Sequence, residues 1–182
     1  MDKKGMIHIY CGEGKGKTTA AIGLTIRAIG YGYKVMYMQF MKPVNTKELA
    51  VLKTIDGITV ETADENEKFS FQMTDGEKAN KKKHNEERFM QVVNRISEEG
   101  NYNMFVIDEC LDCIGAGLLE ENLVLDFLKN KPNDLEVVMT GRSPSSTVIN
   151  LAEYVSRIEK VKSPYDKGIC SKTEISGEGV IA

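Results

Sequence analysis

Short, continuous runs of apolar residues recur along the chain, and such runs are typical of strands buried on both faces of a sheet. The clearest run reads Met-Phe-Val-Ile at residues 104–107 and is followed at once by two acidic residues. The runs lie at residues 6–10, 35–40, 58–61, 104–107 and 136–140, and the run at 58–61 is the weakest. Residues 154–161 alternate instead, which is typical of a strand at a sheet edge.

Stretches with helical periodicity separate these runs. Residues 18–29 repeat apolar positions at helical spacing and precede Gly30, a residue type that commonly ends helices. Residues 75–99 form a long charged pattern, whose second half carries an apolar stripe of Phe89, Met90, Val92, Val93 and Ile96. Both patterns predict helices that pack against the sheet.

Two shorter helices are predicted at residues 118–129 and 145–152. Ser143 followed by Pro144 suits the start of the second one, because proline is favoured in a first helical turn. Strands that alternate with helices predict an α/β domain with a mostly parallel central sheet. Ligands of such sheets bind at the carboxyl ends of the strands. Residues 62–74 and the tail from residue 163 have little periodicity, so we interpret them as loops.

Composition narrows the class of protein. Of the 182 residues, 41% are hydrophobic and 28% charged, so we expect one folded domain spanning residues 1–182. The net charge of -3 argues against a broad nucleic-acid surface. No apolar run is long enough to cross a membrane, and the first residues lack a signal-peptide core, so we expect a cytoplasmic protein. The four cysteines are then expected to be free thiols.

Residues 11–19, named here the phosphate loop, carry the strongest chemical signal. They read Cys-Gly-Glu-Gly-Lys-Gly-Lys-Thr-Thr between a predicted strand and a predicted helix. Three glycines, Gly12, Gly14 and Gly16, allow a tight turn and are expected to aim backbone N–H groups inward at phosphate. The sequence therefore predicts a P-loop, and with it a P-loop NTPase-like three-layer fold.

Two side chains of the phosphate loop complete this chemistry. Lys17 supplies a positive charge to a triphosphate, and the hydroxyl of Thr18 is a suitable ligand for Mg²⁺. The usual motif has a glycine where this chain has Cys11, so the glycine spacing is one residue shorter than usual. We predict that the loop binds ATP with Mg²⁺.

The fourth strand ends in Asp108 and Glu109, and an acidic residue here is the expected second half of a nucleotide site. Such a carboxylate holds Mg²⁺ directly or through water. Adjacent residues on a strand point to opposite faces, so we expect the two carboxylates to have different roles. Arg142 follows the fifth strand and is either a phosphate or ribose ligand or an exposed loop arginine.

Several motifs in this order resemble one family, the bacterial ATP:corrinoid adenosyltransferases of cobalamin synthesis and salvage. The resemblance covers roughly residues 6–170 and rests on residues 12–21 (GEGKGKTTAA), 27–32 (RAIGYG), 39–42 (QFMK), 106–109 (VIDE), 140–142 (TGR) and 161–168 (VKSPYDKG). It implies a homodimeric enzyme that moves the 5′-deoxyadenosyl group of ATP to cobalt. The acceptor is a reduced corrinoid, cob(I)yrinic acid a,c-diamide or cob(I)alamin, and triphosphate is released.

The resemblance also implies residue roles. The triphosphate would be held by Gly12, Glu13, Gly14, Lys15, Gly16, Lys17, Thr18 and Thr19. Arg27 would approach the adenosine end, and Glu109 the metal or the ribose. Because Co(I) is already a strong nucleophile, the reaction needs no general base, and the sequence offers no obvious one. A flavodoxin or flavin reductase would supply the electron that generates Co(I).

An apolar floor for the corrinoid is expected from Phe69 and Phe71, which match a family stretch where two aromatic residues remove the lower cobalt ligand. Phe71 stands where the family often has tryptophan, and the chain contains no tryptophan. Ser163 likewise stands where the family often has histidine, and Pro43 replaces a common glycine. We expect these differences to affect corrinoid binding more than ATP binding.

Two other functions compete with adenosyl transfer. A nucleotide-binding regulatory or scaffold protein would keep the phosphate loop without the chemistry, and a P-loop kinase or NTPase would act on a phosphoanhydride. A zinc or redox role for Cys110 and Cys113 is disfavoured, because a lone C-x-x-C lacks further ligands at suitable spacing. His8 lies inside the first strand and is expected to be a core residue.

Overall fold

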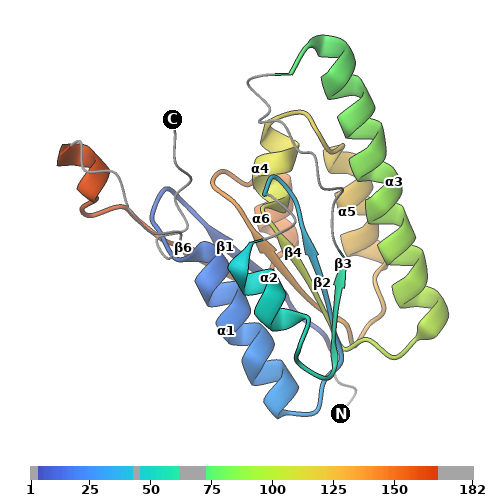
Figure 1. The fold of residues 1–182 in the computed structure, drawn as a ribbon. Helices are drawn as coiled ribbons and strands as arrows, with labels where there is room; N and C mark the ends of the chain where they lie inside the picture. The colour runs from blue at the N-terminus through green and yellow to red at the C-terminus, as the bar shows by residue number, and fades with distance from the viewer. Residues whose placement is uncertain (1–3, 43–45, 62–72, 168–182) are drawn as a thin grey trace.

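A computed structural model describes residues 4–42, 46–61 and 73–167 and contains a six-stranded sheet with the order β3-β2-β4-β5-β1-β6 (Figure 1). Every neighbouring pair of strands is parallel. The strands are β1 (Ile7–Cys11), β2 (Val35–Gln39), β3 (Ile58–Glu61), β4 (Met104–Asp108), β5 (Glu136–Thr140) and β6 (Tyr154–Arg157). The predicted α/β fold with a mostly parallel sheet is confirmed.

Helices cover both faces of this sheet (Figure 1). One face packs against α1 (Lys17–Gly30) and α2 (Lys47–Leu52). The other face is covered by α3 (Asp75–Glu99), α4 (Cys110–Gly115), α5 (Glu121–Asn130) and α6 (Ser146–Leu151). A short 3₁₀ turn, η2 (Pro164–Lys167), follows β6. The arrangement is a three-layer α/β/α fold. Within the described residues, no helix combines the length and apolar character needed to cross a membrane.

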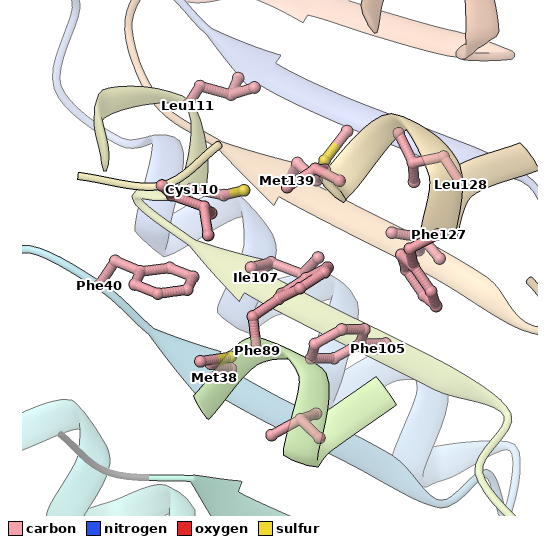
Figure 2. Close-up of a cluster of buried hydrophobic side chains, with 14 of the residues drawn as sticks. Met38, Phe40, Phe89, Phe105, Ile107, Cys110, Leu111, Phe127, Leu128 and Met139 are labelled. Carbon is pink, nitrogen blue, oxygen red and sulfur yellow. The ribbon is translucent and has the colours of Figure 1, made fainter. Parts of the chain in front are cut away.

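Alternate residues of β4 divide between two apolar clusters, one on each face. Phe105 and Ile107 belong to the cluster beneath α3 and α5, whereas Met104 and Val106 face α1. On the first face, Phe105 and Phe127 meet edge to face with ring centroids 5.7 Å apart, as do Phe127 and Phe89 (Figure 2). A strand buried on both sides cannot slip in register without exposing apolar side chains. The packing therefore fixes where each strand ends.

Register brings the carboxyl ends of the central strands level with one another. Gln39 of β2 pairs with Asp108 of β4, and Tyr10 of β1 pairs with Thr140 of β5. The first residues beyond these ends consequently gather along one edge of the sheet. The phosphate loop, between β1 and α1, lies on this edge.

Several predicted boundaries are wrong. The helix predicted at 118–129 begins at Glu121, because Leu118 and Leu119 are buried in the preceding turn. The last short helix is capped by Ser145, whose side chain accepts a hydrogen bond from Val148 N, rather than by Ser143 before Pro144. The predicted edge strand is confirmed in position but ends at Arg157.

The helix ends and faces also differ in detail from the predicted pattern. Gly30 lies inside α1, and the left-handed residue after this helix is Gly32, with φ 79°. On α3, Met90 is exposed, and the buried face of this helix includes the polar residues Asn85 and Arg88. Two further short helices, α2 and α4, were not predicted.

Candidate functional site

The phosphate loop leads into α1 without a side-chain cap. Gly16 is the N-cap residue in a left-handed conformation with φ 117°, and no acidic residue lies in the first turn of α1. The first N–H groups of any helix have no partner within it, and the helix dipole adds partial positive charge there. The N-terminus of α1 is therefore suited to binding an anion.

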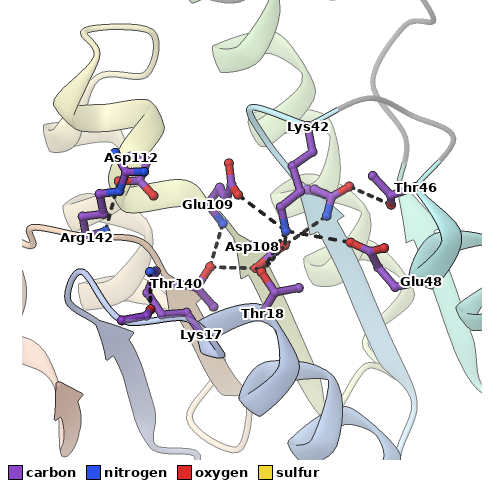
Figure 3. A network of polar contacts seen from close by, with 12 residues as sticks. Lys17, Thr18, Lys42, Thr46, Glu48, Asp108, Glu109, Asp112, Thr140 and Arg142 are labelled. Carbon is purple, nitrogen blue, oxygen red and sulfur yellow. Dashed lines mark hydrogen bonds and ion pairs between the residues drawn. The ribbon is translucent and has the colours of Figure 1, made fainter. Parts of the chain in front are cut away.

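Lys17 directs its ammonium group back over this loop. Its Nζ donates hydrogen bonds to the carbonyl oxygens of Gly12 at 2.8 Å and Gly14 at 3.0 Å (Figure 3). The charge is thus held inside the loop, next to the helix N-terminus. A full and a partial positive charge converge where a phosphate group would lie, as the sequence predicts for Lys17.

The first two glycines of the loop have a different role from the predicted one. Gly12 N donates to Arg142 O at 2.9 Å, and Gly14 N donates to Ile158 O at 2.8 Å. Their N–H groups are bound to backbone carbonyls, so the prediction that these groups point inward at phosphate is wrong. They anchor the loop to the segments that follow β5 and β6.

Residues 158 and 159, which follow β6, pack against the phosphate loop and are named here the wall. The sequence did not predict this contact. Ile158 N donates to Cys11 O at 2.7 Å and continues the contact between β6 and β1. A Cβ atom on Gly12 would lie 2.4 Å from Ile158 O, and one on Gly14 would lie 2.6 Å from Glu159 O. Backbone approaches this close require glycine, which explains both glycines without reference to phosphate.

Asp108 is the centre of a buried polar network. Its fully buried carboxylate accepts hydrogen bonds from four side chains on four different segments (Figure 3). The donors, named here with Asp108 the Asp108 network, are Thr140 Oγ1 at 2.7 Å, Thr18 Oγ1 at 2.9 Å, Lys42 Nζ at 2.9 Å and Gln39 Nε2 at 3.0 Å. Burial alone would raise the pKa of Asp108, but the Lys42 charge and these hydrogen bonds outweigh it and hold the pKa below its usual value. The carboxylate is therefore charged.

Glu109 leaves the strand in a left-handed conformation, with φ 57°. Its N–H donates to Thr140 Oγ1 at 2.8 Å, and its Oε1 lies 3.5 Å from Lys42 Nζ. The alternation of side chains along a strand does not continue through a left-handed residue, so the carboxylates of Asp108 and Glu109 both reach Lys42. The expectation that these two carboxylates point to opposite sides is wrong. Burial raises the pKa of Glu109 to about 7.

The donor atoms of this site fit Mg²⁺. Mg²⁺ prefers oxygen ligands, and P-loop sites supply a Thr or Ser hydroxyl and an acidic residue, with phosphate oxygens and water completing the shell. Thr18 and Asp108 are residues of these two types, and a positive charge, the Lys42 ammonium, contacts both at 2.8 and 2.9 Å. Among the described residues, no group of three or more His, Cys, Asp or Glu side chains is arranged to hold a metal ion.

The remaining predicted residues differ in where they lie relative to the phosphate loop. Glu13, Lys15 and Thr19 are exposed on the loop and first turn of α1. Arg142 is also exposed, with Nε 3.6 Å from Glu13 Oε2, so it lies at the mouth of the loop. Phe69 and Phe71 lie outside the described residues.

Arg27 is not brought to the loop. It lies in the last turn of α1, ten residues beyond Lys17 and so about 15 Å along the helix axis. It lines a hollow with His8 and Glu136, at the amino ends of β1 and β5 and thus at the opposite edge of the sheet. His8 is only partly buried there and lies 3.0 Å from the Glu136 carboxylate.

Cys110 and Cys113 are buried on α4 and form no disulfide. Asn85 Nδ2 lies 3.4 Å from Cys113 Sγ, and burial raises the pKa of the Cys110 thiol. Both thiols belong to the core between α3 and the sheet.

The fold and this site define a P-loop nucleotide-binding protein. The chain resembles a KaiC-like protein, PH0186, from Pyrococcus horikoshii OT3, with a TM-score of 0.55 and 13% identity over 88% of this chain and 76% of that one. It also resembles the cytoplasmic domain of EssC, with a TM-score of 0.56 and 14% identity over 98% of this chain but only 37% of that one. At these identities the likeness shows the fold alone.

Within this class, the chain belongs to the ATP:corrinoid adenosyltransferase family BtuR/CobO/CobP, whose model matches residues 3–176. A corrinoid adenosyltransferase of Escherichia coli K12 is 28% identical over 168 residues, covering 92% of this chain and 83% of that protein. A corrinoid adenosyltransferase of Sinorhizobium sp is 30% identical over 170 residues, covering 92% and 78%. The resemblance inferred from the motifs is confirmed.

Replacing Lys17 tests the loop directly. Lys17→Met removes the charge and keeps a long side chain, so we expect ATP affinity to fall by on the order of a hundredfold, the scale of one lost charged stabiliser. Isothermal titration calorimetry measures this change. Lys129→Met, on the exposed surface of α5, is the matched control and should bind ATP like the unmodified protein. Equal affinities for both variants would remove Lys17 from the site.

Two glycines of the same region test the wall after β6. Gly14→Ala would place its Cβ 2.6 Å from Glu159 O, so the loop must move, and we expect ATP affinity to fall by about tenfold. Gly23, on α1, has open space around it, so Gly23→Ala should raise the free energy of unfolding by about 0.5–1 kcal/mol and leave ATP affinity unchanged. Calorimetry and urea unfolding measure the two effects. Unaltered ATP affinity in Gly14→Ala would contradict the role of the wall.

Proposed function

We propose that this chain transfers the 5′-deoxyadenosyl group of ATP to the cobalt of cob(I)yrinic acid a,c-diamide or cob(I)alamin. The cobalt electron pair attacks C5′ of the ribose, the C5′–oxygen bond breaks, and triphosphate leaves with that bond's electrons. The observation that carries the proposal is the concentration of positive charge in the phosphate loop, where Lys17 and the α1 N-terminus converge. Such charge stabilises a departing triphosphate.

The residues of the site divide this work. The phosphate loop binds and orients the triphosphate, with Lys17 as its main charge and Arg142 at its mouth. Thr18 and Asp108, with Glu109 beside them, would hold Mg²⁺, which neutralises part of the triphosphate charge when bound. The resemblance assigns Arg27 to the adenosine end, and this residue lies in the last turn of α1, about 15 Å along the helix axis from Lys17.

The site provides position and charge rather than acid–base chemistry. Asp108 is engaged by four donors and buried, so it is not available to take a proton from a substrate. Attack by Co(I) requires no deprotonation, and the leaving triphosphate requires no proton if its charge is neutralised. A site of this composition suits a reaction limited by alignment and leaving-group stabilisation.

The corrinoid side of the proposal rests on sequence. Phe69 and Phe71 would form the apolar floor under the corrin ring, removing the lower ligand and making Co(II) easier to reduce. A flavodoxin or flavin reductase would deliver the electron, and the enzyme would act as a homodimer in the cytoplasm. These assignments follow the family resemblance of residues 6–170.

Product analysis separates this function from its alternatives. The protein is incubated with ATP, Mg²⁺ and chemically reduced cobalamin without oxygen. We expect triphosphate and a light-sensitive alkyl cobalamin, whose formation is measured by the visible spectrum. A kinase or NTPase would yield ADP, and a regulatory protein would bind ATP without forming product; either result would contradict adenosyl transfer.

Phe69→Ala and Phe71→Ala test the corrinoid floor. We expect adenosylation to fall most when the assay starts from Co(II) with reduced flavodoxin, because easing that reduction is the proposed role of the two rings. The loss should be smaller with chemically generated Co(I), and ATP affinity should stay the same. If the two rings instead support the fold, both assays fall equally and the melting temperature drops by several degrees.

A further inference from the structure

Lys42 reaches the Asp108 network from the segment after β2. β2 ends at Gln39, and Met41 adopts a left-handed conformation with φ 57° that turns the chain. The Lys42 side chain is 15% exposed, and its ammonium points toward Asp108 (Figure 3). The sequence singled out the stretch containing Lys42 only as part of a family motif and gave it no role.

The surroundings of this ammonium resemble those of a bound cation. Nζ lies 2.8 Å from Thr18 Oγ1 and 2.9 Å from Asp108 Oδ2. Two further carboxylate oxygens approach it, Glu109 Oε1 at 3.5 Å and Glu48 Oε1 at 3.9 Å. One positive charge is therefore surrounded by three carboxylates and a hydroxyl, contributed by α1, α2, the end of β4 and the residue after it.

Thr18 Oγ1 and Asp108 are the groups that would hold Mg²⁺ in the proposed function. Mg²⁺ binds oxygen at about 2.0–2.1 Å and demands near-octahedral geometry. The ammonium already uses a lone pair of the Thr18 hydroxyl and an oxygen of Asp108. Two cations sharing these oxygens would repel each other strongly at such distances, because little water lies between them to screen the charges.

We propose that Lys42 is a tethered counter-ion that competes with Mg²⁺ for Thr18 and Asp108. The lysine neutralises the buried carboxylate whenever the metal is away, and it must swing aside for the metal to bind. A free metal ion gains little by displacing it, since the exchange takes the ammonium from Asp108 and leaves it only the longer contacts with Glu109 and Glu48. Metal arriving with a triphosphate brings the displaced ammonium a new anionic partner beside Thr18. Metal binding is thereby made dependent on the nucleotide.

This inference rests on the metal role of Thr18 and Asp108, but its test needs neither nucleotide nor corrinoid. Mn²⁺ serves as the probe, because the electron paramagnetic resonance signal of the free ion reports the unbound fraction, and Mg²⁺ is added as competitor. We expect Lys42→Met to bind Mn²⁺ at least tenfold more tightly than the unmodified protein. Adding Asp108→Asn to this variant should abolish the gain. Lys53→Met, exposed at the end of α2, is the control and should show no gain.

Thermal unfolding gives an independent measurement. In EDTA, Lys42→Met should melt at a lower temperature than the unmodified protein, because Asp108 is buried without its counter-ion. Mg²⁺ should restore much of that loss in the variant while hardly changing the melting temperature of the unmodified protein. Lys42→Gln, which keeps a hydrogen-bond donor without the charge, replaces the methionine variant if the latter does not fold.

Two results would overturn the proposal. The first is unchanged or weaker Mn²⁺ affinity in a folded Lys42→Met or Lys42→Gln protein. The second is tight Mn²⁺ binding by the unmodified protein without nucleotide, in a manner lost in Asp108→Asn. Neither result bears on the product assay, so failure of the counter-ion role and failure of adenosyl transfer can be told apart.

Discussion

The buried carboxylate of Asp108 is the interaction on which the site depends. Its four donors come from α1, β2, β5 and the segment after β2, so one charged group joins the start of α1 to the ends of β2, β4 and β5. An ionised group this deep is tolerated only when it is fully hydrogen-bonded and neutralised. The network therefore fixes the strand ends relative to the phosphate loop and sets the charge that a ligand meets.

The phosphate loop carries mainly positive charge, whereas negative charges in and around the Asp108 network are offset by a lysine. On the loop side, the Lys17 ammonium is held inside the loop next to the α1 N-terminus, and no acidic residue lies in the first turn of α1. On the other side, three carboxylates are offset by Lys42. A trianion or tetra-anion such as a bound triphosphate complements the first region directly, whereas the second accepts a cation only by exchange. A nucleotide with its metal ion must therefore present an anion to the phosphate loop and a cation that can replace Lys42 in the Asp108 network.

Much of the fold could be predicted from the sequence, because continuous apolar runs such as residues 104–107 are buried on both faces and leave little ambiguity. The positions of Lys17 in the phosphate loop and of Asp108 at a strand end beside Thr18 could be predicted too, since each follows from a local motif. The contacts of Lys42 and the wall at Ile158 could not, because they depend on which strands are neighbours. The cap at Ser145 was missed for a different reason: Ser143 and Ser145 offer the same local chemistry, and only packing decides between them.

The pairing of β1 has a consequence for how the chain is made. β1 lies between β5 and β6, so Ile7 pairs with Val137 and His8 with Tyr154. The phosphate loop also depends on Arg142 and Ile158 for its anchors. During synthesis β1 therefore emerges from the ribosome well before either of the strands with which it pairs. Such long-range pairing slows folding and leaves apolar strands open to aggregation. The phosphate loop gains its anchors only when the segments after β5 and β6 are in place, so ATP binding at this loop requires that these distant strands have already paired.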